Sequence, residues 1–196
     1  MRYDLHIHTE RSPCSDMKLP EIVRIAKKRG LDGIAITDHD ILPKIEGAYD
    51  IDIIPGIEIT TEDGGHVLAY YIKKPVKSKR FEDIIDELKK QDCIIALAHP
   101  RDILRQHFTD EQIDDKRVDA IEAVNGRTLL SGKIRSSKPR IGGSDSHFYN
   151  EIGKAYTEFE GSLRQAIKDD KTRAFGNSRF TTINSARSVI RRFVHR

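Results

Sequence analysis

Short apolar runs alternate with amphipathic stretches through most of this sequence, and that alternation limits the possible folds more than any other feature. The apolar runs predict strands at Tyr3–His8, Gly33–Thr37, Ile51–Ile59, His66–Ile72, Ile94–Ala98, Ala120–Val124, Arg140–Gly143 and, more weakly, Ala155–Phe159. The amphipathic stretches predict helices at Leu19–Arg29, Phe81–Lys90, Ser162–Lys168 and Asn184–Phe193. Strands that alternate with helices are typical of parallel βα units. We therefore expect a single α/β domain.

The size and composition are those of one globular domain. A chain of 196 residues can bury a core without disulfides or a structural metal. The apolar run Cys93–Ala98 is far too short to span a membrane, and the N-terminus lacks the basic and then apolar order of a signal peptide. The two cysteines form no disulfide framework. We expect a cytoplasmic protein that has no membrane partner.

Charge is unevenly distributed along the chain. Residues 171–196 hold seven of the 34 basic residues and no acid, which leaves 27 basic against 31 acidic residues, or a net charge of −4, for residues 1–170. We expect residues 1–178 to form the domain and residues 179–196 to be a basic C-terminal helix or tail of that domain. A basic C-terminal segment on an otherwise acidic chain indicates an anionic partner such as nucleic acid. A solvated surface is the alternative interpretation.

Six of the eight histidines stand at the ends of predicted strands, next to carboxylates. These polar residues are His6, His8, His39, Glu58, His66, His99, Asp145 and His147. In a parallel barrel the carboxyl ends of the strands meet at one rim, where barrel enzymes keep their chemistry, so this pattern favours a small barrel over an open sheet. Imidazole and carboxylate together suit zinc, manganese or iron better than calcium. The remaining histidines, His107 and His195, fit ordinary surface positions.

The number of these ligands is sufficient for two or three divalent ions (Zn, Mn or Fe). Two ions bridged by a carboxylate such as Glu58 could clamp a phosphoryl oxygen and activate a water, which predicts phosphate-ester hydrolysis. Glu58, His99 and Asp145 are then the residues that we expect to act in catalysis. Arginines near the rim could bind the substrate phosphate, and the candidates are Arg101, Arg127 and Arg140.

Seven segments of the chain, in their order, resemble the PHP (polymerase and histidinol phosphatase) domain family: DLHIHT, ITDHD, PGIEIT, GHVLAYY, ALAHP, EAVNG and GGSDSH. The resemblance implies a distorted, seven-stranded (β/α) barrel of the TIM-barrel type with up to three metals at its rim. It assigns the first metal to His6, His8, Glu58 and Asp145, the second to Glu58, His66 and His99, and the third to His39 and His147.

One ligand of the third metal departs from the pattern of the family that the chain resembles. Many members carry a histidine or aspartate a few residues after H-x-H-T, where this chain reads ERSPCSD. We expect Asp16 to complete the third site, with Glu10 and Cys14 as alternatives; a cysteine ligand would favour zinc. Asp4, and Asp38 or Asp40, are candidates for orienting the ligand imidazoles.

The substrate is expected to be a nucleotide, an oligonucleotide or a small phosphomonoester. Two other classes remain open. Amidohydrolase barrels also begin with H-x-H but usually bridge their metals with a carboxylated lysine, where this chain has Glu58. A non-catalytic, RNA-binding barrel would be expected to have lost ligands that this chain keeps.

Overall fold

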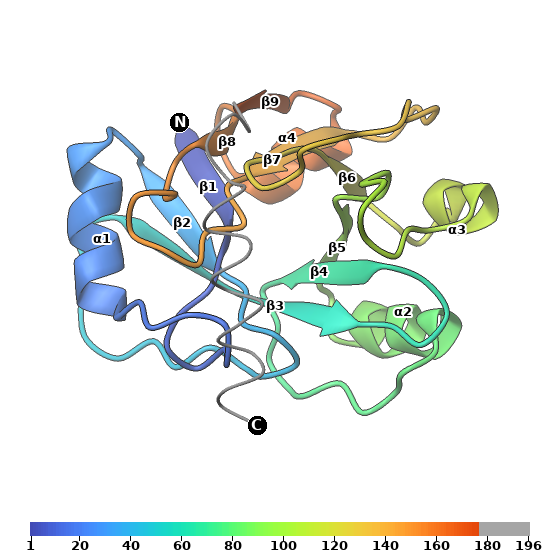
Figure 1. Ribbon diagram of the computed structural model, residues 1–196, viewed down its shortest axis with the longest axis horizontal. Coiled ribbons are helices and arrows are strands. Elements are labelled where there is room, and N and C mark those ends of the chain that lie inside the picture. Colours follow the sequence, from blue (N-terminus) through green and yellow to red (C-terminus); the bar gives the residue numbers. More distant parts are fainter. Residues whose placement is uncertain (177–196) are drawn as a thin grey trace.

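In the computed structural model, which describes residues 1–176, nine strands form one strongly curved sheet with helices on its outside (Figure 1). The strands are β1 (Arg2–Ile7), β2 (Gly33–Ile36), β3 (Asp52–Thr60), β4 (His66–Tyr70), β5 (Ile94–Ala98), β6 (Ala120–Asn125), β7 (Arg140–Gly143), β8 (Ala155–Glu158) and β9 (Arg173–Gly176). The helices are α1 (Leu19–Lys28), α2 (Phe81–Lys90), α3 (Asp110–Asp114) and α4 (Leu163–Lys168). The order in the sheet is β7-β6-β5-β4-β3-β2-β1-β8-β9.

Backbone contacts bring β1 back to the segment after β7, so that the sheet nearly closes. The N–H of His8 donates to the carbonyl of Ser146 (3.0 Å), and the N–H of Ser146 donates to the carbonyl of His6 (3.3 Å). Gly143 permits this approach, because a Cβ at that position would lie 2.4 Å from the Cβ of His6. The seven strands β1–β7 thus form the distorted α/β barrel that the sequence predicts, and β8 and β9 extend the sheet beyond β1.

The direction of β4 decides where its histidine lies. The strand pairs antiparallel with both β3 and β5, in registers that put His66 opposite Thr60 and opposite Ala98. The first residue of β4 therefore lies at the same edge as the last residues of its neighbours. We call this edge the rim; it is formed by the C-terminal ends of β1, β2, β3, β5 and β7 and the start of β4.

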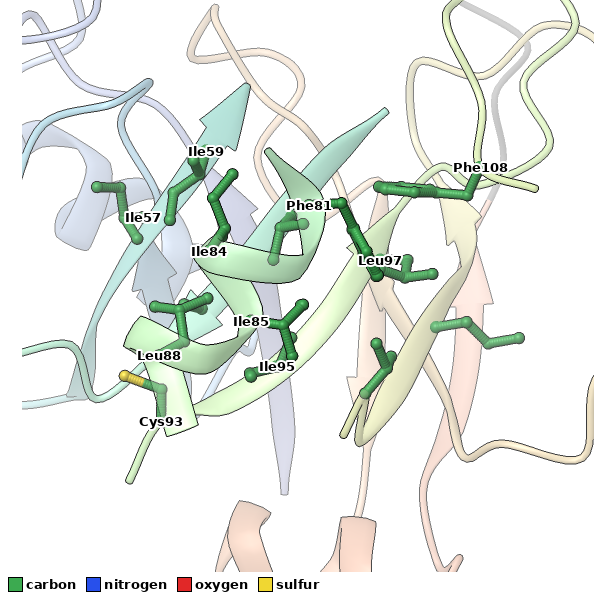
Figure 2. Packing of buried hydrophobic residues seen from close by; sticks show 14 of the residues in the cluster. Ile57, Ile59, Phe81, Ile84, Ile85, Leu88, Cys93, Ile95, Leu97 and Phe108 are labelled. Atoms are coloured by element: carbon green, nitrogen blue, oxygen red, sulfur yellow. The ribbon is translucent and has the colours of Figure 1, made fainter. Parts of the chain in front are cut away.

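The apolar face of α2 holds that helix against the barrel wall (Figure 2). Its spacing of Phe81, Ile84, Ile85 and Leu88 is helical, and all four side chains are buried in one cluster with Ile95 and other residues of β3–β6. Burying one such isoleucine contributes about 1.5–3 kcal/mol. This packing stabilises the strands from the outer face of the barrel, so the polar residues at their rim ends are not required to stabilise the fold.

Two short elements were not predicted from the sequence. The helix α3 begins with a capping box, in which Thr109 and Gln112 satisfy each other's backbone N–H groups, and the T-x-x-Q spacing could have revealed it. The strand β9 pairs antiparallel with β8 and has no alternating pattern of its own. The predicted helix Asn184–Phe193 and the basic residues 179–196 lie outside the described part of the chain. Within residues 1–176 no helix is long and apolar enough to cross a membrane.

Candidate metal centre

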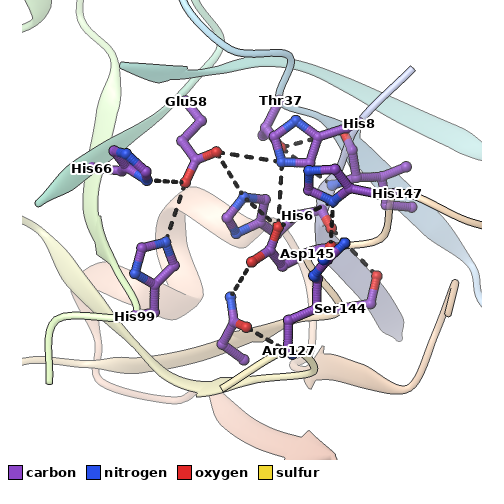
Figure 3. Close-up of polar contacts among 12 residues, drawn as sticks. His6, His8, Thr37, Glu58, His66, His99, Arg127, Ser144, Asp145 and His147 are labelled. Atoms are coloured by element: carbon purple, nitrogen blue, oxygen red, sulfur yellow. Dashed lines mark hydrogen bonds and ion pairs between the residues drawn. The ribbon is translucent and has the colours of Figure 1, made fainter. Parts of the chain in front are cut away.

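The carboxylate of Glu58, at the rim end of β3, lies among five imidazoles, and Figure 3 shows those of His6, His8, His66 and His99 around it. Its Oε2 lies 3.4 Å from His6 Nε2, 3.3 Å from His8 Nε2 and 3.0 Å from His39 Nδ1. Its Oε1 lies 3.0 Å from His66 Nδ1 and 3.3 Å from His99 Nε2. Glu58 is 1% exposed. Since each oxygen faces a different group of imidazoles, the carboxylate is placed as a bridging ligand would be.

Asp145 supplies the second carboxylate from the loop after β7. Its Oδ1 lies 3.5 Å from His8 Nε2 and 3.8 Å from His6 Nε2. The Nδ1 of His147 lies 3.5 Å from the same oxygen. These distances place Asp145 beside the His6–His8 pair and His147.

Two of these residues have left-handed backbone conformations. The φ angles are +32° at His99 and +54° at Asp145. Such a conformation costs about 1–2 kcal/mol for a residue with a Cβ. Each residue directly follows or nearly follows a barrel strand, so the turn aims its side chain back over the rim. Strain of this kind is concentrated at functional sites.

Hydrogen bonds fix the orientation of two imidazoles. Glu122 Oε1 lies 2.9 Å from His6 Nδ1, and because a carboxylate only accepts, His6 carries a proton on Nδ1 and directs Nε2 toward Glu58. The Nδ1 of His8 contacts Ser12 Oγ (3.3 Å), and Ser12 donates to Asp38 (2.7 Å). This is the outer-shell support that metal-binding histidines usually have.

The pKa values of the carboxylates and imidazoles in the cluster are shifted by burial and by neighbouring charges. Burial opposes the charge of Glu58, but the imidazoles around it, His6 among them, outweigh this effect and hold the pKa of Glu58 well below its usual value. Burial, together with the neighbouring His8 and His66, lowers the pKa of His39 to about 3 despite the proximity of Glu58. Burial likewise lowers the pKa values of His99 and His147. These three imidazoles are therefore neutral, which is the form that binds a metal.

Several buried polar atoms at the rim have no hydrogen-bond partner: His6 Nε2, His8 Nε2, His39 Nδ1, His66 Nδ1 and Glu58 Oε2. A buried polar atom without a partner costs about 1–3 kcal/mol. These atoms converge, and three overlapping groups of ligand atoms each lie within 4.8 Å of one another: His6, His8 and Glu58; Glu58, His66 and His99; and His8, Cys14, His39 and His147. Because nitrogen and carboxylate ligands suit zinc, manganese and iron, the residues present fit divalent ions of this kind.

The loop between β1 and α1 is arranged differently from the prediction. Asp16 and Glu10 are exposed, whereas Cys14 is 4% exposed and belongs to the third ligand group. The reason is a compact turn in which Ser12 N–H donates to Thr9 O (3.0 Å) and Glu10 N–H donates to Met17 O (2.9 Å). This turn directs Cys14 inward. Asp16, the ligand predicted for the third site, thus belongs to none of the three ligand groups, whereas the alternative Cys14 belongs to one of them.

Of the three arginines that the sequence suggested, Arg127 lies near the centre and the other two do not. Arg101 pairs with Asp110 of α3, and exposed Arg140 begins β7 at the end opposite the rim, so neither of them lies at the centre. Arg127 is buried, with Nη1 3.6 Å from Glu151 Oε2, and its charge helps to lower the pKa of His147. Arg105, which the sequence analysis missed, places Nη1 2.7 Å from Asp145 Oδ2.

Two of the acids predicted to orient imidazoles, Asp4 and Asp40, have other roles. Asp4 accepts from the backbone N–H groups of Ser144 (2.8 Å) and Gly153 (2.7 Å), so it braces the loop after β7 and orients no imidazole. Asp40 accepts from the backbone of Thr60 (3.1 Å). Glu122, which orients His6, was not predicted, although an acid inside the apolar run AIEAV was a usable signal.

A nearly closed α/β barrel whose rim carries a cluster of imidazoles and carboxylates defines a class of metal-dependent proteins. The family model of the PHP domain matches residues 4–171, and the chain belongs to the PHP domain family. This confirms the resemblance on which the sequence analysis relied.

Among curated relatives, the chain is 28% identical over 142 residues to the uncharacterized protein MJ1587 of Methanocaldococcus jannaschii, a match that covers 64% of this chain and 82% of that protein. Among solved structures, a two-domain protein of Bacteroides vulgatus that contains a predicted PHP-like metal-dependent phosphoesterase shares 23% identity and a TM-score of 0.65, over 90% of this chain and 65% of that one. PsfC of Pseudomonas syringae shares 17% identity and a TM-score of 0.67, over 98% of both chains. At these identities the structural matches show the fold.

Proposed function

We propose that this chain is a hydrolase of phosphate esters that works with two or three divalent ions at the rim. The observation that carries the proposal is that one buried carboxylate, Glu58, belongs to two ligand groups at once. A carboxylate shared in this way could bridge two adjacent ions, and adjacent ions are the arrangement that two-metal hydrolytic centres use. When bound, such ions supply a nucleophilic water near neutral pH and neutralise charge on the phosphoryl oxygens.

The residues of the chain divide this work. His6, His8, Glu58 and Asp145 would hold one ion; Glu58, His66 and His99 would hold another; and His39 and His147 would contribute to a third. Glu122 holds a proton on Nδ1 of His6, so Nε2 is the atom aimed at the centre that would bind the ion. Glu58 and Asp145 are ionised, because the cations around them hold the pKa values of both carboxyls low despite burial.

The substrate phosphate has two basic neighbours at the centre. Arg105 contacts Asp145, and Arg127 lies close to His147. Arginine suits phosphate because its planar guanidinium can donate two parallel hydrogen bonds. The side chains of His39 and His66 are 12% and 21% exposed, which is more than those of the other rim histidines, so the scissile group would enter from that side.

We further propose that the substrate is a nucleotide, a short oligonucleotide or a small phosphomonoester. The seven basic residues of 171–196 favour a polyanionic substrate. Of the alternatives, the amidohydrolase reading is weakened because Glu58 takes the position of a bridging carboxylated lysine. The RNA-binding reading is weakened because the ligand groups are intact.

The test compares ion-loaded protein with protein stripped by a chelator, on an aryl phosphate, a phosphodiester, nucleotides and a cyclic amide. Phosphate-ester turnover should require zinc or manganese and should fall at least about 100-fold in Glu58→Gln. Glu62→Gln, at an exposed position of the next loop, is the matched control and should retain activity. Failure of the folded, loaded protein on every phosphate ester, or turnover of the cyclic amide alone, would refute the proposal.

A further inference from the structure

The third ligand group contains a thiol, which the other two groups lack. Cys14 offers Sγ within 4.8 Å of one nitrogen each of His8, His39 and His147. We propose that Cys14 binds the third ion as a thiolate and makes that position selective for zinc or cobalt(II) over manganese and magnesium. The inference rests on the metal centre of the proposed function, although it does not depend on the reaction.

The position of Cys14 is fixed by its neighbours in the loop. Ser15 Oγ donates to the backbone carbonyl of His8 or of His147, both at 3.2 Å. The N–H of Ser15 donates to Ser12 O (3.1 Å). One serine therefore links the cysteine's turn to the backbone of two members of the ligand group. The loop holds the thiol in place before any ion binds, so little ordering is required on binding.

The imidazoles indicate how the ligands divide between ions. The Nδ1 of His8 is held by Ser12 Oγ, while its buried, unpartnered Nε2 faces Glu58 and Asp145 at 3.3 and 3.5 Å. His8 thus serves the ion that it shares with His6. Cys14, His39 and His147 remain as three protein ligands for the third ion. Three ligands leave an open position, as in catalytic rather than structural zinc sites.

Ligand chemistry then predicts the selectivity. The other two groups contain only nitrogen and carboxylate oxygen, and such groups accept zinc, manganese or iron. Thiolate is a soft ligand that favours zinc and other thiophilic ions, whereas manganese and magnesium prefer oxygen. Manganese alone should therefore fill the two groups around Glu58 and leave the third position open.

The second cysteine provides an internal control. Cys93 is 3% exposed and lies in the apolar cluster beneath α2, where burial raises the pKa of its thiol to about 11. It belongs to none of the three ligand groups. A spectroscopic signal from a metal–thiolate bond should therefore depend on Cys14 alone.

The experiment loads the full chain with cobalt(II) and records the near-ultraviolet thiolate-to-cobalt charge-transfer band. The band should be present in the wild type and in Cys93→Ser and absent in Cys14→Ser. Elemental analysis after zinc loading and dialysis should find one zinc ion fewer per chain in Cys14→Ser. Absence of the band at full cobalt loading, or its persistence in Cys14→Ser, would overturn the inference.

Two further variants distinguish loss of the Cys14 ligand from misfolding and test whether Asp16 is the ligand instead. Cys14→His should regain the missing zinc without the band, because imidazole replaces the thiolate. Asp16→Asn should keep both the band and the zinc content; loss of the third ion in this variant but not in Cys14→Ser would assign the ligand to Asp16 and overturn the inference. If phosphate esters are hydrolysed but the band is absent, only this inference is refuted. If the band is present but no phosphate ester is hydrolysed, only the proposed function is refuted.

Discussion

Replacing Glu122 by glutamine should weaken metal binding although the residue contacts no ion. The Glu122 carboxylate accepts three hydrogen bonds: from His6 Nδ1–H (2.9 Å), from the backbone N–H of His99 (2.9 Å) and from Asn125 Nδ2 (2.9 Å). Glutamine keeps one acceptor oxygen and replaces the other by an NH₂ donor. One side of the new amide must therefore face a donor.

The arrangement that loses fewest hydrogen bonds keeps the amide oxygen on His99 and Asn125 and turns the NH₂ toward His6. His6 then has to accept at Nδ1, so its proton moves to Nε2, which is the atom directed at Glu58. An imidazole protonated at that atom cannot bind the ion. Loss of such outer-shell support typically lowers metal affinity about 10–100-fold, or about 1.4–2.8 kcal/mol.

Competition with a chromophoric chelator, or calorimetry, measures this loss as a change in the zinc dissociation constant of Glu122→Gln. Glu62→Gln, which removes the same charge from an exposed position, is the control and should bind zinc like the wild type. Circular dichroism should show the native fold in both proteins. Unchanged zinc affinity in folded Glu122→Gln would refute the argument that this carboxylate sets the tautomer of His6.

Four other predictions concern the metal centre and the basic C-terminal residues. Burial opposes a proton on His6, but Glu122, Glu58 and other acids outweigh this effect and raise the pKa of His6 well above 6.5. Zinc uptake at pH 7 should therefore release protons, and zinc affinity should increase with rising pH. A pH indicator measures the release, and zinc binding without proton release would contradict the prediction. The same ion pairs stabilise the metal-free protein below pH 6.5 and lose that contribution as the pH rises through the raised pKa, so urea midpoints of metal-free and loaded protein should diverge toward alkaline pH. Arg105→Ala should lower kcat/KM for an aryl phosphate about 10–100-fold, as expected for one charged hydrogen bond, whereas Arg101→Ala should change it little; equal effects would remove Arg105 from the site. Deletion of residues 179–196 should weaken oligonucleotide binding and flatten its dependence on salt while sparing the aryl phosphate, and equal losses would indicate a structural role.

The strands and the main ligands could be predicted because their signals are local. An apolar run such as Ile94–Ala98 identifies a buried strand by itself, and a histidine directly after it must lie at the strand's end. The strand at His66–Ile72 was predicted from its own apolar run, and the short turn after β3 makes β4 pair antiparallel with that strand. The parallel arrangement then brings residues distant in sequence, such as His6 and Asp145, to one rim.

The choice among neighbouring polar side chains was decided only by the tertiary structure. Cys14, Glu10 and Asp16 lie in one short loop, and composition does not distinguish which of them faces the centre. That choice depends on Ser15 reaching the carbonyl of His147, 132 residues away in the chain. Arg105 takes the place expected for Arg101 for a similar reason, because Asp110 pairs with Arg101 from another element.

The sequence by itself thus determined which main strands form and which of their ends carry the histidines and carboxylates of the rim, since burial and backbone geometry act over a few residues. The tertiary structure decided which loop side chains complete the centre and which acid orients His6. Those choices depend on hydrogen bonds between segments distant in the chain, whose free energies become available only when the barrel has formed.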